Sequence, residues 1–144
     1  MQHRPEACAS DVGDGQSCMV FAVQQIDECV KYWLLNVVCK AKPDSGIVNF
    51  RWVNVDKESG LPYDFEVVCS DSEVKYVEVK ATLSDHKACF EFSHRELVFA
   101  NDKGAQYHLY RVYCAGDPLR VRLVRVENLA RRLEERQLKL FMAI

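Results

Sequence analysis

Two acidic residues and a lysine lie on neighbouring stretches of this chain and could together act on a charged substrate. Asp64 begins one strand-like segment, and Glu78 and Lys80 stand two positions apart on the next. Side chains alternate across a strand, so Glu78 and Lys80 share one face while Val79 takes the other. A hairpin that joins the two segments would bring Asp64 beside this pair.

This set of side chains suits metal-assisted cleavage of a phosphodiester bond. Asp64 and Glu78 would hold Mg²⁺ or Mn²⁺, which prefer oxygen ligands, and the backbone carbonyl of Val79 would add a further oxygen. The ion would polarise the phosphate and help to generate hydroxide. Lys80 would orient the water or stabilise charge in the transition state. The alternative is a solvated cross-strand ion pair, which Glu-x-Lys on a strand usually marks.

A β-hairpin is expected to position these residues. Residues 63–69 are rich in aromatic and β-branched side chains, residues 70–73 form a polar turn, and residues 74–81 alternate in type. The preceding segment, 56–62, contains glycine and proline and therefore predicts a loop. That loop delivers the chain to Asp64.

The N-terminal half should begin with a helix and a strand. Apolar residues recur at helical spacing over residues 17–40, and Pro43 ends the pattern. Asp27 lies beside the apolar stripe of this helix, where a carboxylate needs a partner, unless it is a helix-edge charge next to Lys31. Residues 47–55 alternate and predict the first strand.

A second helix is expected after the hairpin. Ser93 and Glu96 form the Ser-x-x-Glu pattern of a capping box, and the helix should run over residues 93–103 and stop at Gly104. Capping by itself accounts for both side chains. Residues 106–114 then alternate and predict a strand with one mostly buried face.

The C-terminal part is expected to add a strand over residues 119–125 and a helix over residues 127–141. The helix should direct four apolar side chains inward: Leu129, Leu133, Leu140 and Phe141. Between residues 117 and 144 there are seven basic and four acidic residues, which could hold a phosphate backbone. A solvated surface is the commoner meaning of such a stretch. Arg120 and Arg122, on one side of the strand, are secondary candidates for nucleic-acid contact.

Length and charge bound the organisation of the chain. With 144 residues, we expect a flexible lead-in over residues 1–16 and a single domain over residues 17–144. The net charge is −2, so any nucleic-acid surface must come from a local patch. No apolar run is as long as a membrane span, so no membrane contact is expected.

The cysteines argue against a zinc site. There are seven of them, without a Cys-x-x-Cys pair, although structural zinc sites usually contain closely spaced ligand pairs. Free buried thiols are the simpler explanation. They predict a reducing compartment, which means an intracellular protein of the nucleus or cytoplasm.

Four ordered motifs resemble a known family. They are GLPYDFEV (60–67), YVEVKAT (76–82), FEFSHREL (90–97) and YHLYRVY (107–113), and over roughly residues 22–140 they resemble the domain at the C-terminus of plant NO VEIN proteins. Asp64, a short hairpin and then Glu78-x-Lys80 also resemble the active-site signature of the PD-(D/E)xK nuclease superfamily.

The resemblance implies a fold and further site residues. The fold is a restriction-endonuclease-like α/β core of order αβββαβ, with a central mixed sheet between two layers of helices and an added C-terminal strand and helix. Helix 17–40 would cover one face of the sheet and helix 93–103 the other. An acid on the first helix often faces the metal in this family, which here would be Asp27. The loop after the hairpin often lies against the substrate, which makes Lys87 a contact candidate. Arg95, in the first turn of the second helix, could meet a phosphate.

Two functions remain open at this stage. One is Mg²⁺-dependent hydrolysis of DNA or RNA, with nucleic acid as the partner. The other is a module that has lost catalysis and binds nucleic acid or protein within a larger regulatory chain, beside an ATPase-like region or partner. In the second case Asp64, Glu78 and Lys80 would remain as a buried ion-pair cluster.

Overall fold

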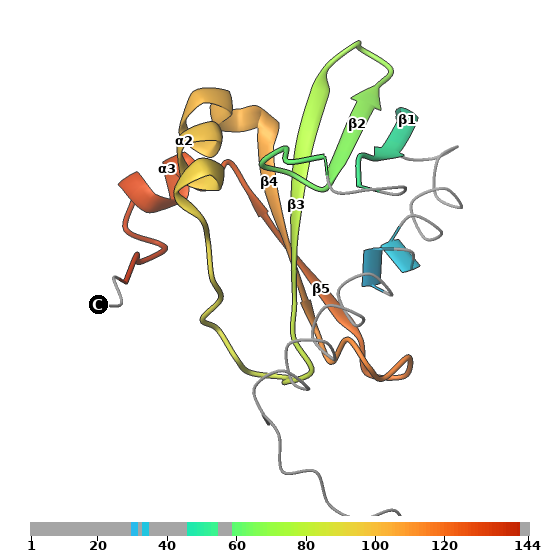
Figure 1. The fold of residues 1–144 in the computed structure, drawn as a ribbon, viewed down its shortest axis with the longest axis vertical. Helices are drawn as coiled ribbons and strands as arrows, with labels where there is room; N and C mark the ends of the chain where they lie inside the picture. Colours follow the sequence, from blue (N-terminus) through green and yellow to red (C-terminus); the bar gives the residue numbers. More distant parts are fainter. Residues whose placement is uncertain (1–29, 32, 35–45, 55–58, 142–144) are drawn as a thin grey trace, which may run out of the picture.

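A five-stranded mixed sheet forms the centre of the molecule (Figure 1). The computed structural model describes residues 30, 31, 33, 34, 46–54 and 59–141. Its strands are β1 (Ile47–Trp52), β2 (Phe65–Cys69), β3 (Val74–Ala81), β4 (Tyr107–Tyr113) and β5 (Arg122–Glu127). Its helices are α2 (His94–Lys103), the 3₁₀ turn Gly104–Gln106 and α3 (Leu129–Glu134).

The strands lie in the order of the sequence, β1-β2-β3-β4-β5. Neighbouring strands are antiparallel except for β3 and β4, which run parallel. Parallel strands need a long return connection, and here residues 82–93 followed by α2 provide it. The expected mixed α/β arrangement, with the hairpin of β2 and β3 at its centre, is therefore confirmed.

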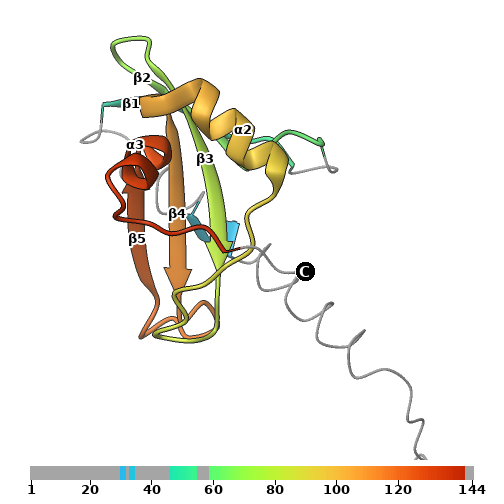
Figure 2. The same ribbon diagram turned by 90° about the vertical axis from the view of Figure 1, so that its left-hand side faces the viewer.

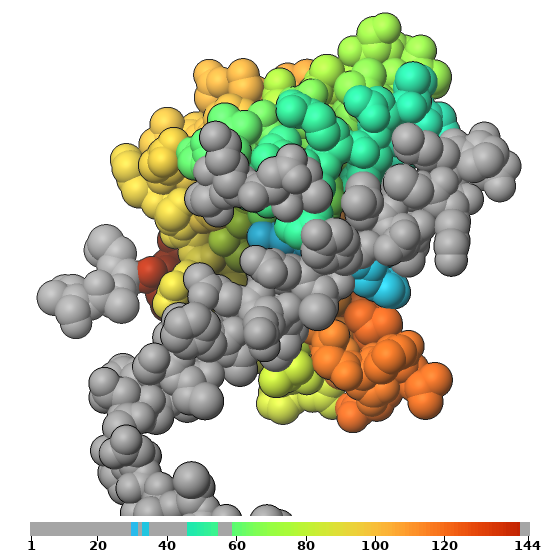
Figure 3. Space-filling view, turned by 45° about the vertical axis from the view of Figure 1, so that its right-hand side comes forward, coloured from blue at the N-terminus to red at the C-terminus, as the bar shows by residue number. Residues whose placement is uncertain are grey.

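One face of the sheet packs against the N-terminal helical residues. Val30 and Leu34 are helical and buried, and they belong to the same apolar cluster as Val77 and Val79 of β3. Figure 3 shows part of this helical segment (blue) between the β1 segment (teal) and the segment that joins β4 to β5 (orange). The rest of the expected helix 17–40, its Asp27 and the lead-in 1–16 lie outside the described residues.

The other face packs against α2 and α3, which lie side by side over β3, β4 and β5 (Figure 2). Ala100 of α2 and Leu129 of α3 are buried here against Tyr107 and Leu109 of β4. Strand β4 is therefore covered on both faces, whereas the sequence pattern predicted one mostly buried face.

The second helix agrees with its prediction. The Ser93 hydroxyl accepts a hydrogen bond from the Glu96 N–H at 3.2 Å, and the Glu96 carboxylate accepts one from the Ser93 N–H, so the capping box is complete. The helix ends at Gly104, whose φ of 53° lies in the left-handed region.

The last strand begins later than expected, at Arg122 instead of residue 119. Asp117 holds the chain in a turn, because its carboxylate accepts the Leu119 N–H at 3.0 Å and its carbonyl accepts the Arg120 and Val121 N–H groups at 3.1 and 2.9 Å. These amides are therefore directed into the turn and not toward β4.

The final helix is much shorter than expected. It ends at Glu134, and Arg136 follows with a left-handed φ of 58°. The N–H groups of Arg136 and Gln137 then bond to the carbonyls of Leu133 and Arg132, which is the Schellman pattern of helix ends. Leu140 and Phe141 are consequently 59% and 80% exposed, so their predicted inward orientation is wrong.

This shorter helix predicts a contrast between two apolar residues. Leu129→Ala should lower the free energy of unfolding by about 2–3 kcal/mol, because Leu129 is 4% exposed and fills the second apolar cluster. Phe141→Ala should change it by less than about 0.5 kcal/mol. Urea unfolding of both variants measures the two values. Equal losses of stability in the two variants would contradict the short helix and indicate that Phe141 is buried.

Within the described part of the chain, Cys69, Cys89 and Cys114 are free thiols, and of these Cys114 is buried. No helix in the same residues is long and apolar enough to cross a membrane.

Candidate active site

Asp64 lies where β3 extends beyond its pairing with β2. The paired register of the two strands ends at Phe65 opposite Val77. One residue earlier, the Asp64 N–H donates to the Val77 carbonyl at 2.9 Å, and the Asp64 Oδ2 accepts the Val79 N–H at 2.9 Å. The carboxylate thus satisfies a strand N–H that the β2 backbone no longer reaches.

The second oxygen of Asp64 contacts the N-terminal helical segment. The Nζ of Lys31 lies 2.5 Å from Asp64 Oδ1, and the two side chains are only 14% and 5% exposed. The sequence offered no signal for this contact beyond the position of Lys31 on a predicted helix. The sequence by itself identifies Lys31 only as a neighbour of Asp27.

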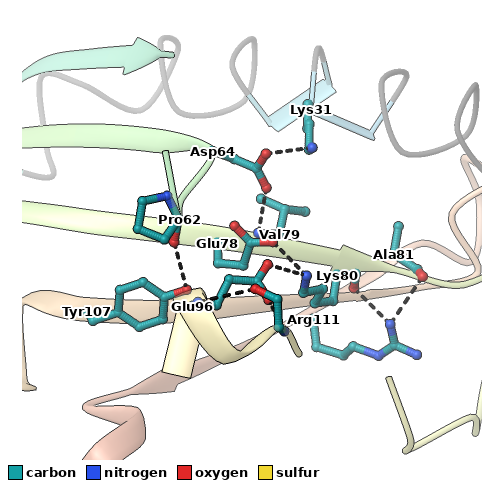
Figure 4. A network of polar contacts seen from close by, with 11 residues as sticks. Lys31, Pro62, Asp64, Glu78, Val79, Lys80, Ala81, Glu96, Tyr107 and Arg111 are labelled. Atoms are coloured by element: carbon teal, nitrogen blue, oxygen red, sulfur yellow. Dashed lines mark hydrogen bonds and ion pairs between the residues drawn. The ribbon is translucent and has the colours of Figure 1, made fainter. Parts of the chain in front are cut away.

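Glu78 and Lys80 share one face of β3, and α2 covers that face (Figure 4). The Nζ of Lys80 lies 2.7 Å from Glu78 Oε1 and also 2.7 Å from Glu96 Oε1. Glu96 therefore has two roles, because its other oxygen completes the capping box at Ser93. Sequence reasoning ranked capping first for Glu96, and it did not predict the contact with Lys80.

Glu78, Lys80 and Glu96 shift one another's pKa. Burial raises the pKa of Glu78 well above its usual value, and the neighbouring carboxylates of Asp64 and Glu96 raise it further against the charge of Lys80. Burial alone would lower the pKa of Lys80, but Glu78 and Glu96 outweigh it and raise that pKa. Burial would raise the pKa of Glu96, but hydrogen bonds with Glu78, Lys80 and Ser93 outweigh it and lower that pKa. Lys80 is therefore a firmly protonated ammonium between two carboxyl groups.

The raised pKa of Glu78 predicts that it lowers stability at neutral pH. Below the ordinary glutamate pKa of about 4.3, Glu78 is protonated both folded and unfolded. Above that pH the unfolded chain ionises while the folded protein keeps the proton, so the free energy of unfolding falls until the folded pKa is passed. Glu78→Gln, which cannot ionise, should gain stability over wild type as the pH rises, by about 1.4 kcal/mol per unit of the pKa shift.

Urea unfolding with a chelator present, repeated from about pH 4.5 to about pH 8, measures this gain. Glu66→Gln is the matched control, because Glu66 lies on β2 in an exposed pair with Arg51 at 2.9 Å. Parallel stability curves for Glu78→Gln and wild type would contradict the expected burial of this carboxyl group.

Two donors hold the loop that leads to Asp64. The hydroxyl of Tyr107, a fully buried residue, donates to the Pro62 carbonyl at 3.2 Å, and Arg95 donates to the Gly60 carbonyl at 2.6 Å. Burial raises the pKa of Tyr107, and the nearby carboxylates raise it further. Arg95, a secondary nucleic-acid candidate, therefore contacts the loop of its own chain.

The other basic candidates gather around the segment after β3. Arg120 lies 3.3 Å from a carboxylate oxygen of Asp85, and Arg122 donates to the Asp85 carbonyl at 3.2 Å. Lys87 is exposed two residues further on. The structure thus brings Arg120, Arg122 and Lys87 to one segment and places Arg95 elsewhere, on α2.

Asp64 and Glu78 are the predicted metal ligands of this site, and Glu96 is a third carboxyl group close to Glu78. The carbonyl of Val79 lies on the same edge of β3 as the Val79 N–H that Asp64 accepts, because both backbone groups of a strand residue point to one side. Among the described residues, one group of three or more His, Cys, Asp or Glu side chains has its ligand atoms within 4.8 Å of one another. It lies at the β2–β3 turn and consists of Cys69, Asp71 and Glu73. Ligation by Asp64 and Glu78 alone would suit an ion that keeps several of its waters.

A family model described as the C-terminal part of Protein NO VEIN matches residues 30–124. The chain is also 45% identical over 62 residues to Protein NO VEIN and to Protein NO VEIN-LIKE, both from Arabidopsis thaliana. Each alignment covers 43% of this chain but only 2% and 10% of the two relatives, so the chain spans a small part of their length. No solved structure matches it significantly. Because the family model covers more than half of the 144 residues, the chain belongs to the family of NO VEIN C-terminal domains.

Proposed function

We propose that this domain is a metal-dependent phosphodiesterase acting on DNA or RNA, with the restriction-endonuclease-like fold of the PD-(D/E)xK superfamily. The observation that supports it most is the meeting of Asp64, Glu78 and Lys80 where β3 extends beyond β2. The parallel pairing of β3 and β4, with α2 between them in the sequence, agrees with the αβββαβ order of that fold.

The donor set fits Mg²⁺ or Mn²⁺. Asp64 and Glu78 present hard oxygen atoms, and Asp64 helps to raise the pKa of Glu78, so a metal ion bound between them would favour the ionised form of Glu78. Together with the Val79 carbonyl they would hold the ion. When bound, it would supply Lewis-acid polarisation of the phosphate and a water of lowered pKa.

The remaining side chains have roles of their own in this proposal. Lys80, kept protonated by Glu78 and Glu96, would donate a hydrogen bond to a phosphate oxygen and stabilise the charge that develops there. Because the pKa of Lys80 is raised, it would act as a cation and not as a base. Arg120, Arg122 and Lys87 would contact the backbone of the nucleic acid.

A second function is supported by the pairing inside the cluster. Lys31 contacts Asp64, and Lys80 contacts both Glu78 and Glu96, so each carboxylate already has an ammonium partner. A cluster neutralised in this way would suit a non-catalytic module that binds nucleic acid or protein within a larger regulatory protein. The length of the matching relatives is consistent with a larger parent chain.

The test is a cleavage assay on double-stranded and single-stranded DNA and RNA, with Mg²⁺ and with Mn²⁺. The wild type should cleave at least one substrate, and Glu78→Gln should lose activity by at least about 100-fold, because it removes a metal-ligand charge while the fold is retained. Glu66→Gln, which changes an exposed carboxylate on β2, should cleave like wild type.

Calorimetry with Mn²⁺ separates the two functions. Binding by wild type and its loss in Glu78→Gln would support the enzyme. If the wild type neither cleaves any substrate nor binds Mn²⁺, the non-catalytic module is the better account. The search would then move to protein partners.

A further inference from the structure

Arg111 is a buried cation that the chemistry described above does not use. It lies on β4 directly opposite Lys80 in the parallel register, and only 4% of the residue is exposed. Its neighbours along the strand are Tyr110 and Val112. An arginine there is costly to bury, so its contacts should be specific.

Its contacts are with backbone oxygens and aromatic rings. Nη1 donates to the carbonyls of Lys80 and Ala81 at 3.0 and 3.1 Å, and Nη2 donates to the carbonyl of Lys87 at 2.9 Å. The guanidinium carbon lies 5.3 Å from the ring centres of both Phe90 and Tyr113. Figure 4 shows the two bonds to the end of β3.

No carboxylate in the described part of the chain forms an ion pair with Arg111, and its buried Nε has no hydrogen-bond partner there. A merely stabilising role would be served better by an apolar residue of similar volume, since buried charges are often neutral or unfavourable for stability. The planar fork of the guanidinium has one evident use here, which is to reach several oxygens at once.

Those oxygens belong to two segments whose relative position matters for the site. Lys80 and Ala81 end β3, and Lys87 lies in the middle of the 82–93 connection. That connection leads to α2, whose Glu96 contacts Lys80 at 2.7 Å.

The 82–93 connection contains no helix or strand. Backbone hydrogen bonds hold its start, from the Thr82 N–H to the Val112 carbonyl and from the Cys114 N–H to the Ser84 carbonyl. Beyond Ser84, side chains such as Arg111 and Arg122 hold its backbone carbonyls.

We propose that Arg111 is a positioning residue, which ties the end of β3 to the 82–93 connection and so keeps Glu96 in contact with Lys80. For catalysis this inference rests on the proposed function. The structural part of the inference does not rest on the proposed function, and its main test does not require the protein to cleave a substrate.

The main test is a double-mutant cycle between Arg111→Met and Glu96→Gln, measured by urea unfolding. If Arg111 acts through the connection, the double variant should lose less stability than the sum of the losses of the two single variants. The difference should amount to at least about fivefold in the unfolding equilibrium constant. The matched control is Arg125→Met combined with Glu96→Gln. Arg125 also lies over a tyrosine ring, Tyr110 at 5.6 Å, but it sits on β5 and should give additive losses.

Hydrogen exchange gives a second, local measurement. In Arg111→Met the amides of residues 84–87 should exchange at least about tenfold faster at conditions where the variant is folded, and in Arg125→Met they should not change. If Arg111→Met fails to fold, Arg111→Lys replaces it in both experiments, because it keeps the charge and loses the fork.

Additive losses together with unchanged exchange at residues 84–87 would overturn the proposal. In an active protein, Arg111→Lys should lower kcat by at least about tenfold and leave KM nearly unchanged, since Arg111 does not touch substrate. An inactive wild type that still shows the coupling would refute the proposed enzyme and leave the positioning role in place.

Discussion

Replacing Lys80 with methionine should abolish cleavage and lower the free energy of unfolding by about 3–5 kcal/mol, because it leaves buried carboxylates without their cation. Lys80 lies between Glu78 and Glu96 at 2.7 Å from each, and Asp64 adds a further negative charge nearby. Methionine keeps a similar length and removes only the ammonium. Urea unfolding and the cleavage assay measure the two effects.

Two further variants make this result specific. Lys75→Met, on the same strand, removes a looser pair with Glu73 at 3.6 Å and should cost less than about 1 kcal/mol. Adding Glu78→Gln to Lys80→Met removes one stranded charge and should recover part of the lost stability without recovering activity. If Lys80→Met is as stable as wild type, the carboxylates are not buried and paired as described.

Replacing Asp64 with alanine should have an effect of similar size, about 3–5 kcal/mol, because it removes the carboxylate that pairs with the mostly buried Lys31 ammonium and also the acceptor of a backbone N–H. Lys31 would lose a contact of 2.5 Å, and the Val79 N–H would lose its acceptor at 2.9 Å. Asp64→Asn keeps an oxygen for Val79 and loses only the charge, so it should cost less than half as much. Both variants should fail to cleave.

The comparison of alanine with asparagine separates the backbone contact from the ion pair. Asp102→Ala provides the control, because the Asp102 side chain is 67% exposed and, among the described residues, forms an ion pair only with Lys103, at 3.1 Å. In thermal unfolding, Asp64→Ala should therefore have the lowest melting temperature, Asp64→Asn a higher one, and Asp102→Ala one close to that of wild type. Equal losses for the two Asp64 variants would assign the whole effect to the pair with Lys31.

These expectations connect stability to function in a testable way. Glu78 is expected to lower stability at neutral pH, whereas Lys80 and Asp64 are expected to contribute to it, although all three lie in one cluster. Residues selected only for a stable core would not include a carboxyl group that opposes folding. A gain in stability for Glu78→Gln, with a loss of cleavage, is therefore the combination that a working site predicts.

Local sequence signals determined the elements that carry the site. The alternation in residues 63–81 predicts the β2–β3 hairpin, and it also predicts that Glu78 and Lys80 share a face. The Ser-x-x-Glu pattern predicts where α2 starts. Each of these signals depends on residues within a few positions of one another, so it can be read without knowing the fold.

The largest errors in the predicted elements concern the C-terminal part. There the apolar period continues past the point where Arg136 adopts a left-handed φ and ends α3. The turn at Asp117 likewise takes up residues that alternate as a strand would. In both places backbone hydrogen bonds at an element's end outweighed a periodic pattern.

Only the tertiary structure decided which charged groups meet. Lys31 reaches Asp64 because the N-terminal helical segment packs on one face of β3, and Glu96 reaches Lys80 because α2 packs on the other. Arg111 is opposite Lys80 because β3 and β4 pair in a parallel register. Pairing between segments far apart in the chain depends on strand order, register and helix packing, which the periodicity of a single segment does not encode.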